Sequence, residues 1–559
     1  MKRIVLSLLF VFSVGFLYSQ SQRLVLLEEF TQASCGPCAS INPTIKALLE
    51  SNPDKITSVW YHTSWPGTDP MNEDNPTEVA ARVGYYGVTY VPWSVLDGNY
   101  YSGSASGWNI NTVNNRYAVP SPFSMGLQHY LNAAQDSIFV TMVATASEDV
   151  SGSMAAHNVV IEKNIHFNYA PGSNGEKDFK NVMKKMLPTK DGTTLPTAME
   201  TGDYVLIQEA WKLANVYDKS QLAAVAFVQN KTSKEILQSV NSSVDALVLP
   251  YDNDLQVLEI SEVSGTNCSG TIIPRITVRN NGNDAVASFD LKYRVNDESE
   301  ATFSWSGSMA SLQKVVLDLP AYNFTPLLSN TLKVYSSEPN SLPDEYMKND
   351  TMTFTIAEAP ITCPTIYVYI KTDNAPGETT WDVRTASGIV VASGGPYTTN
   401  GALIKDTVEL QFYGCYVFNL YDAGGNGLCC SNGNGLFYVL DALGVTIAEG
   451  NKFGSHTFNE FNYTDLSYIP DVKQAGTLTV APNPSDGNGT VMLTLNNASP
   501  VTAALVNTMG RVVKTWDFDV LPSGAHDFSL DAADLSAGLY ILQVKAGRQT
   551  LSTKVAIVK

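Results

Sequence analysis

Two kinds of hydrophobic spacing divide this chain into a short first part and a long second part. Residues 23–30 form an apolar run of strand length, and a segment with helical spacing follows it. The apolar positions of that segment are Ile41, Ile45, Leu48 and Leu49. A further strand is predicted at 56–60 and a helix around 78–83. Alternating strands and helices favour a mostly parallel or mixed sheet, so we expect residues 22–120 to form an α/β domain.

From residue 121 onward the helical spacing fades, and short alternating runs favour β-sandwiches. One helix is still predicted near 179–186. The expected fold class is therefore multidomain, with an N-terminal α/β domain followed by several all-β sandwich or jelly-roll domains. The expected β domains are a sandwich at 121–250, an immunoglobulin-like domain at 251–360, a jelly-roll-like domain at 361–465 and a small terminal sandwich at 477–559.

The first residues have the layout of a secretory signal peptide. Lys2 and Arg3 precede an apolar run at 4–16, and small or polar residues follow around Ser19. We therefore assign residues 1–19 to the signal peptide and exclude them from the fold. No later stretch reaches the roughly 18 apolar residues of a membrane helix, so we expect a soluble, exported mature chain without a transmembrane segment.

Charge and motif content exclude several function classes. The net charge is −19, from 54 acidic and 35 basic residues, which argues against nucleic acid or anionic membranes as partners. The sequence contains no nucleophile elbow and no H-E-x-x-H motif, so a protease or a glycosidase lacks support.

The motif Cys35-Gly36-Pro37-Cys38 lies between the first predicted strand and the first predicted helix. The free amides of a helix start stabilise a thiolate, so Cys35 is the expected nucleophile. Cys38 lies one turn further on and can resolve a mixed disulfide formed on Cys35. This chemistry requires a Cys35 sulfur that solvent can reach.

Five further cysteines follow, which makes the total of seven odd. Candidates for one or two structural disulfides are Cys363, Cys415, Cys429 and Cys430. Their connectivity is open, and Cys268 is either free or paired with one of them. The Gly-rich loop at Asp422 offers oxygen atoms for calcium, but we favour a structural turn there and predict no metal and no cofactor.

Three features around the motif resemble the thioredoxin family. Pro43 follows the second cysteine by five residues, Glu29 precedes the first by six, and Val91-Pro92 opens a later strand. The resemblance implies that Pro92 is a cis-proline beside the dithiol and that the Val91 backbone holds a substrate peptide. It also implies that Glu29 helps to deprotonate Cys38. Ser34 departs from the family, which carries an aromatic residue at that position.

Two further resemblances concern larger parts of the chain. Residues 22–250 resemble an outer-membrane protein family of Bacteroidota that joins a thioredoxin-like domain to a β-sandwich, on the basis of three short segments. These are Glu28-Glu29-Phe30-Thr31, Tyr61-His62 with Asp69-Pro70, and Phe227-Val228-Gln229-Asn230 with the following Lys234 to Gln238. His62 is a weak candidate for a residue near the dithiol.

The tail resembles the type IX secretion C-terminal sorting domain. The segments that carry this resemblance are Ala481-Pro482-Asn483-Pro484, residues 507–513 and residues 535–540. It implies contact with the type IX secretion machinery and a location at the cell surface, on the outer membrane, or outside the cell.

Together these features predict an exported thiol-disulfide oxidoreductase that acts on protein thiols or disulfides. In that prediction Cys35 attacks, Cys38 resolves, Glu29 assists proton transfer and Pro92 shapes the peptide site. The alternative is a non-enzymatic surface adhesin or binding protein in which Cys35 and Cys38 form a permanent structural bond.

Overall fold

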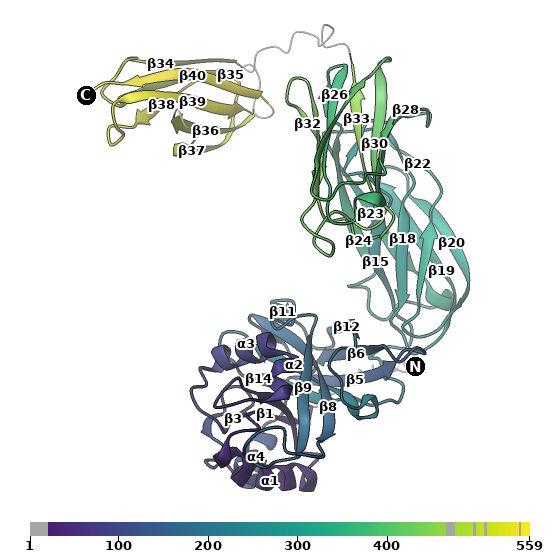
Figure 1. The fold of residues 1–559 in the computed structure, drawn as a ribbon. Coiled ribbons are helices and arrows are strands. Elements are labelled where there is room, and N and C mark those ends of the chain that lie inside the picture. Colours follow the sequence, from purple (N-terminus) through teal and green to yellow (C-terminus); the bar gives the residue numbers. More distant parts are fainter. Residues whose placement is uncertain (1–20, 465–475, 496–498, 508–510, 547–548) are drawn as a thin grey trace, which may run out of the picture. The chain divides into compact units, whose positions relative to one another are not determined.

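The computed structural model describes residues 21–464, 476–495, 499–507, 511–546 and 549–559. Strands account for 53% of the chain and helices for 9%, so the protein is β-rich and built from several sheets (Figure 1). Two compact units are distinguished. Unit 1 comprises residues 1–263, 272–324 and 331–354, and unit 2 comprises residues 264–271, 325–330 and 355–559. Among the described residues, no helix is long and apolar enough to cross a membrane.

A large mixed sheet forms the centre of the N-terminal part of unit 1, with strand order β14-β13-β8-β9-β2-β1-β3-β4. Its strands are β1 (Val25–Thr31), β2 (Ile56–His62), β3 (Trp93–Leu96), β4 (Tyr101–Ser104), β8 (Met154–His166), β9 (Asp178–Leu187), β13 (Leu222–Asn230) and β14 (Ile236–Asn241), with β10 (Thr193–Thr194) beside β8. Strand β1 pairs in parallel with β2 and antiparallel with β3. The parallel pair is the arrangement that a strand-helix-strand order predicts.

The helices cover both faces of this sheet around β1 (Figure 1). They are α1 (Gly36–Ser51), α2 (Pro70–Asp74), α3 (Pro76–Tyr86) and α4 (Ile110–Tyr117). Val25 and Leu27 of β1 pack in one core with residues of α1 and α4. Leu26 and Phe30 point to the opposite face, where they pack with residues of α3. All seven residues of β1 are therefore buried, which explains its continuous apolar pattern.

The segment at 179–186, which we expected to be helical, is the strand β9, and that expectation was wrong. Strand β9 pairs antiparallel with β8, and the register of this pairing shifts by one residue. Val160 of β8 faces Lys185 of β9, whereas the next residue, Ile161, faces Met183. Lys184 is thus an extra residue in the strand, which is the definition of a β-bulge. The bulge changes the alternation of buried positions, so the apolar spacing imitates a helix.

Strands from beyond residue 121 complete the N-terminal sheet, so this sheet crosses the boundary expected near residue 120. A second sheet with the order β12-β6-β5 packs on β8 and β13 and shares a core with them that includes Phe123, Met142 and Val160. The remaining elements of this region are β5 (Phe123–Leu131), β6 (Ser137–Ala146), β7 (Val150–Ser151), β11 (Ala198–Met199), β12 (Tyr204–Lys212) and the 3-10 turn η1 (Lys219–Gln221).

The following residues, up to 358, form strands and one short 3-10 turn. These elements are β15 (Leu255–Ser261), β16 (Thr266–Asn267), β17 (Thr271–Ile272), β18 (Arg275–Asn280), β19 (Val286–Val295), β20 (Ala301–Met309), β21 (Lys314–Asp318), β22 (Tyr322–Asn323), β23 (Ser329–Ser337), η2 (Pro339–Ser341) and β24 (Thr351–Glu358). In unit 1 they include a sheet of β15, β18 and β21, and strand β19 pairs with both β20 and β23.

Residues 361–463 of unit 2 form two sheets, β25-β33-β30-β27-β28 and β29-β26-β31-β32, around one apolar core. The elements are β25 (Ile361–Thr362), β26 (Thr365–Lys371), η3 (Pro376–Glu378), β27 (Thr379–Thr385), β28 (Val390–Gly394), β29 (Leu403–Glu409), β30 (Gly414–Asp422), β31 (Leu436–Asp441), β32 (Thr446–Gly450) and β33 (His456–Tyr463). Buried and exposed positions alternate along β26, as expected for a strand with one face in a core.

The C-terminal residues form a further pair of sheets, β34-β35-β38 and β37-β36-β39-β40, with their own core. The strands are β34 (Gly476–Ala481), β35 (Asn488–Leu495), β36 (Ser499–Asn507), β37 (Val512–Leu521), β38 (Gly524–Asp531), β39 (Gly538–Ala546) and β40 (Gln549–Ile557).

A buried ion pair between Glu28 and Arg82 joins β1 to α3. Arg82 Nε donates to Glu28 Oε1 at 2.9 Å, and both side chains lie in the interior. Replacing Glu28 by alanine leaves the Arg82 charge buried and unpaired, so we expect Glu28→Ala to lower the free energy of unfolding by about 3–5 kcal/mol. Thermal and denaturant unfolding measure this loss.

The matched control is Glu50→Ala, which removes the partner of Lys180 from an ion pair at the surface. We expect this variant to unfold like the wild type, because exposed pairs contribute little. Equal stability of Glu28→Ala and Glu50→Ala would contradict the role assigned to the buried pair.

Candidate functional site

Cys35 and Cys38 are joined by a disulfide at the turn between β1 and α1. Cys35 occupies the N-cap position of α1, and its Sγ accepts a hydrogen bond from the Cys38 amide at 3.1 Å. Pro37 lies in the first turn of the helix, where its missing amide leaves no helical hydrogen bond unmade. In the reduced protein the same amide and the helix dipole favour a thiolate on Cys35.

The structure places Val91 and Pro92 beside the disulfide. The Val91 carbonyl oxygen lies 3.6 Å from Cys35 Sγ, and the Val91-Pro92 peptide bond is cis. This segment directly precedes β3, which pairs with β1, so the sheet itself brings residues 91–92 to the end of β1. The exposed ring of Tyr90 stacks edge-on against Trp93 at 4.8 Å on the same segment.

Glu29 lies inside the sheet on β1 and is completely buried. Ser94 of β3 donates a hydrogen bond to its Oε2, whereas Oε1 has no partner among the described residues. Burial raises the pKa of Glu29 well above its ordinary value, and the Ser94 hydrogen bond opposes this rise only in part. The interior therefore favours the protonated form of Glu29 more strongly than water does.

Both cysteines of the disulfide are buried. Redox chemistry, in contrast, requires a Cys35 sulfur that solvent can reach. Cys35 is 3% exposed and Cys38 is 0% exposed. The connection between β8 and β9, residues 167–177, which we call the strap, is bonded to the turn that carries Cys35. The Asn174 side chain donates to the Cys35 carbonyl oxygen at 3.2 Å. Sequence spacing gave no signal for this contact, because the two residues are 139 positions apart.

His62 and Asp69 support the turn that carries Cys35. Asp69 Oδ2 lies 2.7 Å from His62 Nδ1 and accepts a hydrogen bond from the Ala33 amide at 2.7 Å. Burial alone raises the pKa of Asp69, but His62 and the amide hydrogen bonds outweigh it and hold this pKa below its ordinary value. The pair thus fixes the backbone next to the disulfide, while its imidazole makes no hydrogen bond to a sulfur.

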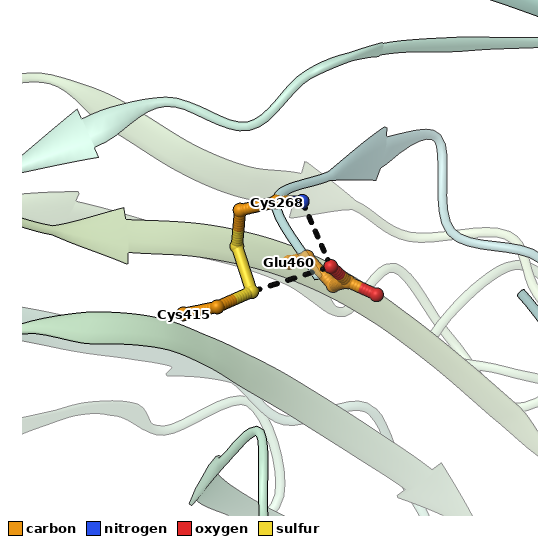
Figure 2. A group of neighbouring side chains, drawn as sticks. All are labelled: Cys268, Cys415 and Glu460. Atoms are coloured by element: carbon orange, nitrogen blue, oxygen red, sulfur yellow. Dashed lines mark hydrogen bonds between the residues drawn. A yellow bond between two sulfur atoms is a disulfide. The ribbon is translucent and has the colours of Figure 1, made fainter. Parts of the chain in front are cut away.

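A second disulfide joins Cys268 to Cys415 in unit 2 (Figure 2). Glu460 lies beside it: its Oε2 accepts from the Cys268 amide at 2.9 Å and is 3.3 Å from Cys415 Sγ. Burial raises the pKa of Glu460, and hydrogen bonds from the loop at 267–269 act against that rise. Because both sulfurs are used in the disulfide, this group provides no thiolate ligands for a metal ion.

The remaining cysteines show which of the pairing candidates are used. Cys429 and Cys430 are bonded to each other, whereas Cys363 is a buried free thiol. Of the four candidates, Cys363 is the one that forms no disulfide, and Cys268 is paired with Cys415. In the adjacent loop Asp422 Oδ2 accepts from the amides of Asn426 and Gly427, and these hydrogen bonds close a turn.

Comparison with known proteins identifies the C-terminal part. Residues 479–559 match the family described as the secretion system C-terminal sorting domain, which confirms the predicted type IX sorting domain. No curated protein matches the chain. The chain is thus exported to the cell surface or secreted, and its tail is the part that engages the secretion machinery.

Solved structures with low similarity cover larger parts of the chain. HBP35 of Porphyromonas gingivalis is 12% identical, with a TM-score of 0.34, and the match covers 60% of this chain and 98% of that one. The BSP domain of a biofilm-associated protein is 10% identical, with a TM-score of 0.15 and coverages of 78% and 96%. The CARDB domain of PF1109 from Pyrococcus furiosus is 20% identical, with a TM-score of 0.17 and coverages of 21% and 95%.

The Cys268–Cys415 disulfide closes a long loop, with a sequence separation of 147. Cross-links of this length remove much conformational entropy from the unfolded chain, so we expect the double variant Cys268→Ser/Cys415→Ser to lose about 3–5 kcal/mol of stability. Thermal unfolding of the full chain measures the loss. The matched control is Cys429→Ser/Cys430→Ser, because a bond between adjacent residues closes only the small ring of those two residues and removes little entropy from the unfolded chain. Equal unfolding of the two double variants would contradict this account.

Titration of Glu29 should make the stability of the folded protein depend on pH. Since its pKa is raised in the folded state, the folded protein binds more protons than the unfolded chain once the pH exceeds the ordinary value of 4.5. Stability then falls as the pH rises towards the raised pKa. Glu29→Gln keeps an acceptor for Ser94 and removes the titration, so its melting temperature relative to the wild type should rise between about pH 5 and about pH 8. A difference in melting temperature that is independent of pH would refute the assignment.

Proposed function

We propose that residues 22 to about 120, together with the strands that complete their sheet, form a thioredoxin-like unit that exchanges thiols and disulfides outside the cell. The observation that carries this proposal is the arrangement at the start of α1. The Cys38 amide points at Cys35 Sγ, and the Val91 carbonyl of the cis-proline segment lies 3.6 Å from the same sulfur. These are the groups that activate a nucleophile and present it to an extended peptide.

In this proposal the exchange takes place in two balanced steps. The Cys35 thiolate attacks a substrate disulfide, so that a Cys35–substrate bond forms and one substrate thiolate leaves. The Cys38 thiolate then attacks Cys35 Sγ, closes the internal disulfide and releases the second substrate thiolate. Two electrons pass to the substrate, whose thiolates take up two protons. The reverse sequence begins with the closed disulfide and oxidises a substrate dithiol.

Glu29 is the proposed proton acceptor for Cys38. Its support is the buried Oε1 atom without a hydrogen-bond partner, on a strand that ends at the dithiol turn. The hydrogen bond from Ser94 leaves this atom free while it fixes the carboxyl group. The raised pKa of the Glu29 carboxyl group lies closer to the pKa of a thiol than an ordinary carboxyl pKa does. Proton transfer between the two groups is therefore easier.

One observation favours a second candidate function. Both sulfurs are buried, as expected for a permanent structural bond in an exported protein. In that case the chain is a surface adhesin or binding protein, and its β-rich parts carry the contacts. A structural bond resists reduction and has a potential below about −300 mV, whereas an exchanging bond equilibrates with dithiols at higher potentials.

Trapping of mixed disulfides tests the proposed exchange. We expect the purified chain to catalyse exchange with a model protein disulfide, Cys35→Ser to lose at least about 100-fold of that rate, and reduced Cys38→Ser to accumulate a covalent complex through Cys35.

The matched control is Cys363→Ser, which removes the free thiol of unit 2 and should leave both the rate and the trapping unchanged. Equal rates for the wild type and Cys35→Ser would reject the enzyme and leave the binding protein.

A further inference from the structure

The strap crosses the turn that carries the nucleophile and holds it by its backbone. The Asn174 amide donates to the Ala33 carbonyl at 3.2 Å. The Asn174 side chain donates to the carbonyls of Gln32 at 3.3 Å and Cys35 at 3.2 Å. Three of the four residues between β1 and α1, Gln32, Ala33 and Cys35, are thus bonded through their carbonyls to a single asparagine.

Ser34 is held by the strap and by a second loop. Its Oγ accepts from the Ser173 amide at 3.0 Å and donates to the Thr68 carbonyl at 2.9 Å. The residue that replaces the aromatic side chain of the thioredoxin family is therefore a hydrogen-bonding partner of the strap. Its small side chain leaves room for the strap to approach the turn.

The approach is close enough to require glycine. A Cβ atom at Gly172 would lie 2.2 Å from the Ala33 carbonyl oxygen, which is backbone and cannot rotate away. Any larger residue at this position must displace the strap from the turn.

A carboxylate fixes the end of the strap to α1. Glu176 accepts from Asn42 at 3.0 Å and from Asn174 at 2.8 Å, and it lies 3.6 Å from Lys46 Nζ. Asn42 and Lys46 both belong to α1, the helix that starts at the dithiol. The strap is therefore bonded to the turn before the helix and to the helix itself.

Phe167 at the start of the strap packs against an apolar cluster that includes Ala33 and Phe179, but beyond it hydrogen bonds, and not apolar burial, hold the strap in place. None of the residues 168–178 is buried, and Tyr169 is almost fully exposed. Segments with few buried apolar contacts open locally at a much lower free energy than the core. The strap can thus leave the dithiol turn while the sheet stays folded.

We infer that the strap is an access gate for Cys35, and that Asn174 is the residue that sets how often this gate opens. The inference rests on the proposed exchange function and names its regulation. With the gate closed the disulfide is shielded from thiols in the medium. With the gate open the Cys35 sulfur and the Val91 backbone face the same vacated surface, where a substrate polypeptide can bind.

Two variants open the gate by different means. Asn174→Ala removes the side-chain hydrogen bonds to Gln32, Cys35 and Glu176, and Gly172→Ala introduces the clash with Ala33. Each lost hydrogen bond shifts an equilibrium severalfold, so we expect both variants to be reduced by a small dithiol about ten-fold faster than the wild type. The readout is the rate of alkylation of Cys35 and Cys38, measured by mass spectrometry of their peptide.

The matched control is Lys177→Ala, which lies on the strap and whose side chain donates to the Asn168 carbonyl within the strap, not to the dithiol turn. Its rate should stay within about two-fold of the wild type, as should the equilibrium of each variant with the dithiol, because a gate changes access and not thiol chemistry. Melting temperatures identify any variant that is globally unfolded.

The outcomes separate the gate from the exchange function. Equal reduction rates for the wild type, Asn174→Ala and Gly172→Ala would overturn the gate, as would a shifted equilibrium at an unchanged rate. Faster reduction of both variants without any transfer to a protein substrate would support the gate and reject the exchange function.

Discussion

The complete burial of β1 is the constraint on which the N-terminal structure depends. Helices cover this strand on both faces and strands flank it on both edges, so its side chains have no access to water. Any polar residue on it must find a partner inside the protein. Glu28 pairs with Arg82, and Glu29 bonds to Ser94 while one of its oxygens stays unpaired. The strand then leaves the core at the dithiol turn, so a completely buried strand positions the cysteines.

Local patterns predicted the elements around the dithiol because their signals are short in range. The apolar run of β1, the spacing along α1 and the turn chemistry of Cys35 to Cys38 all lie within one stretch of about 30 residues. The strand β9 escaped this reasoning, since its bulge at Lys184 produces helix-like spacing. The shared sheet also escaped it, because strand pairing between residues 60 and 182 leaves no local pattern.

The same distinction explains how much of the site was predictable. Cys35, Cys38 and the Val91-Pro92 segment could be named from motifs, and the structure brings Val91 to Cys35. Three contacts depend on folding of distant segments: the hydrogen bond from Asn174 to the Cys35 carbonyl, the pairing of Cys268 with Cys415, and the hydrogen bond from Ala33 to Asp69. Ser34, before the first cysteine, was the one sequence signal of the strap. Its role could be recognised only from the structure, in which its Oγ accepts a hydrogen bond from the Ser173 amide.

The nature of the cover bears on which of the two candidate functions fits better. A permanent structural disulfide gains nothing from a strap whose residues 168–177 are not buried and are bonded to the disulfide's turn through hydrogen bonds. A reactive disulfide in an oxidising, thiol-poor environment would have a use for the inferred gate, because a closed strap would lower the rate of exchange while the Cys38 amide stays bonded to Cys35 Sγ. Burial of the sulfurs and thiol chemistry are therefore compatible if the strap acts as the gate inferred above, since a segment held in this way opens while the core stays intact.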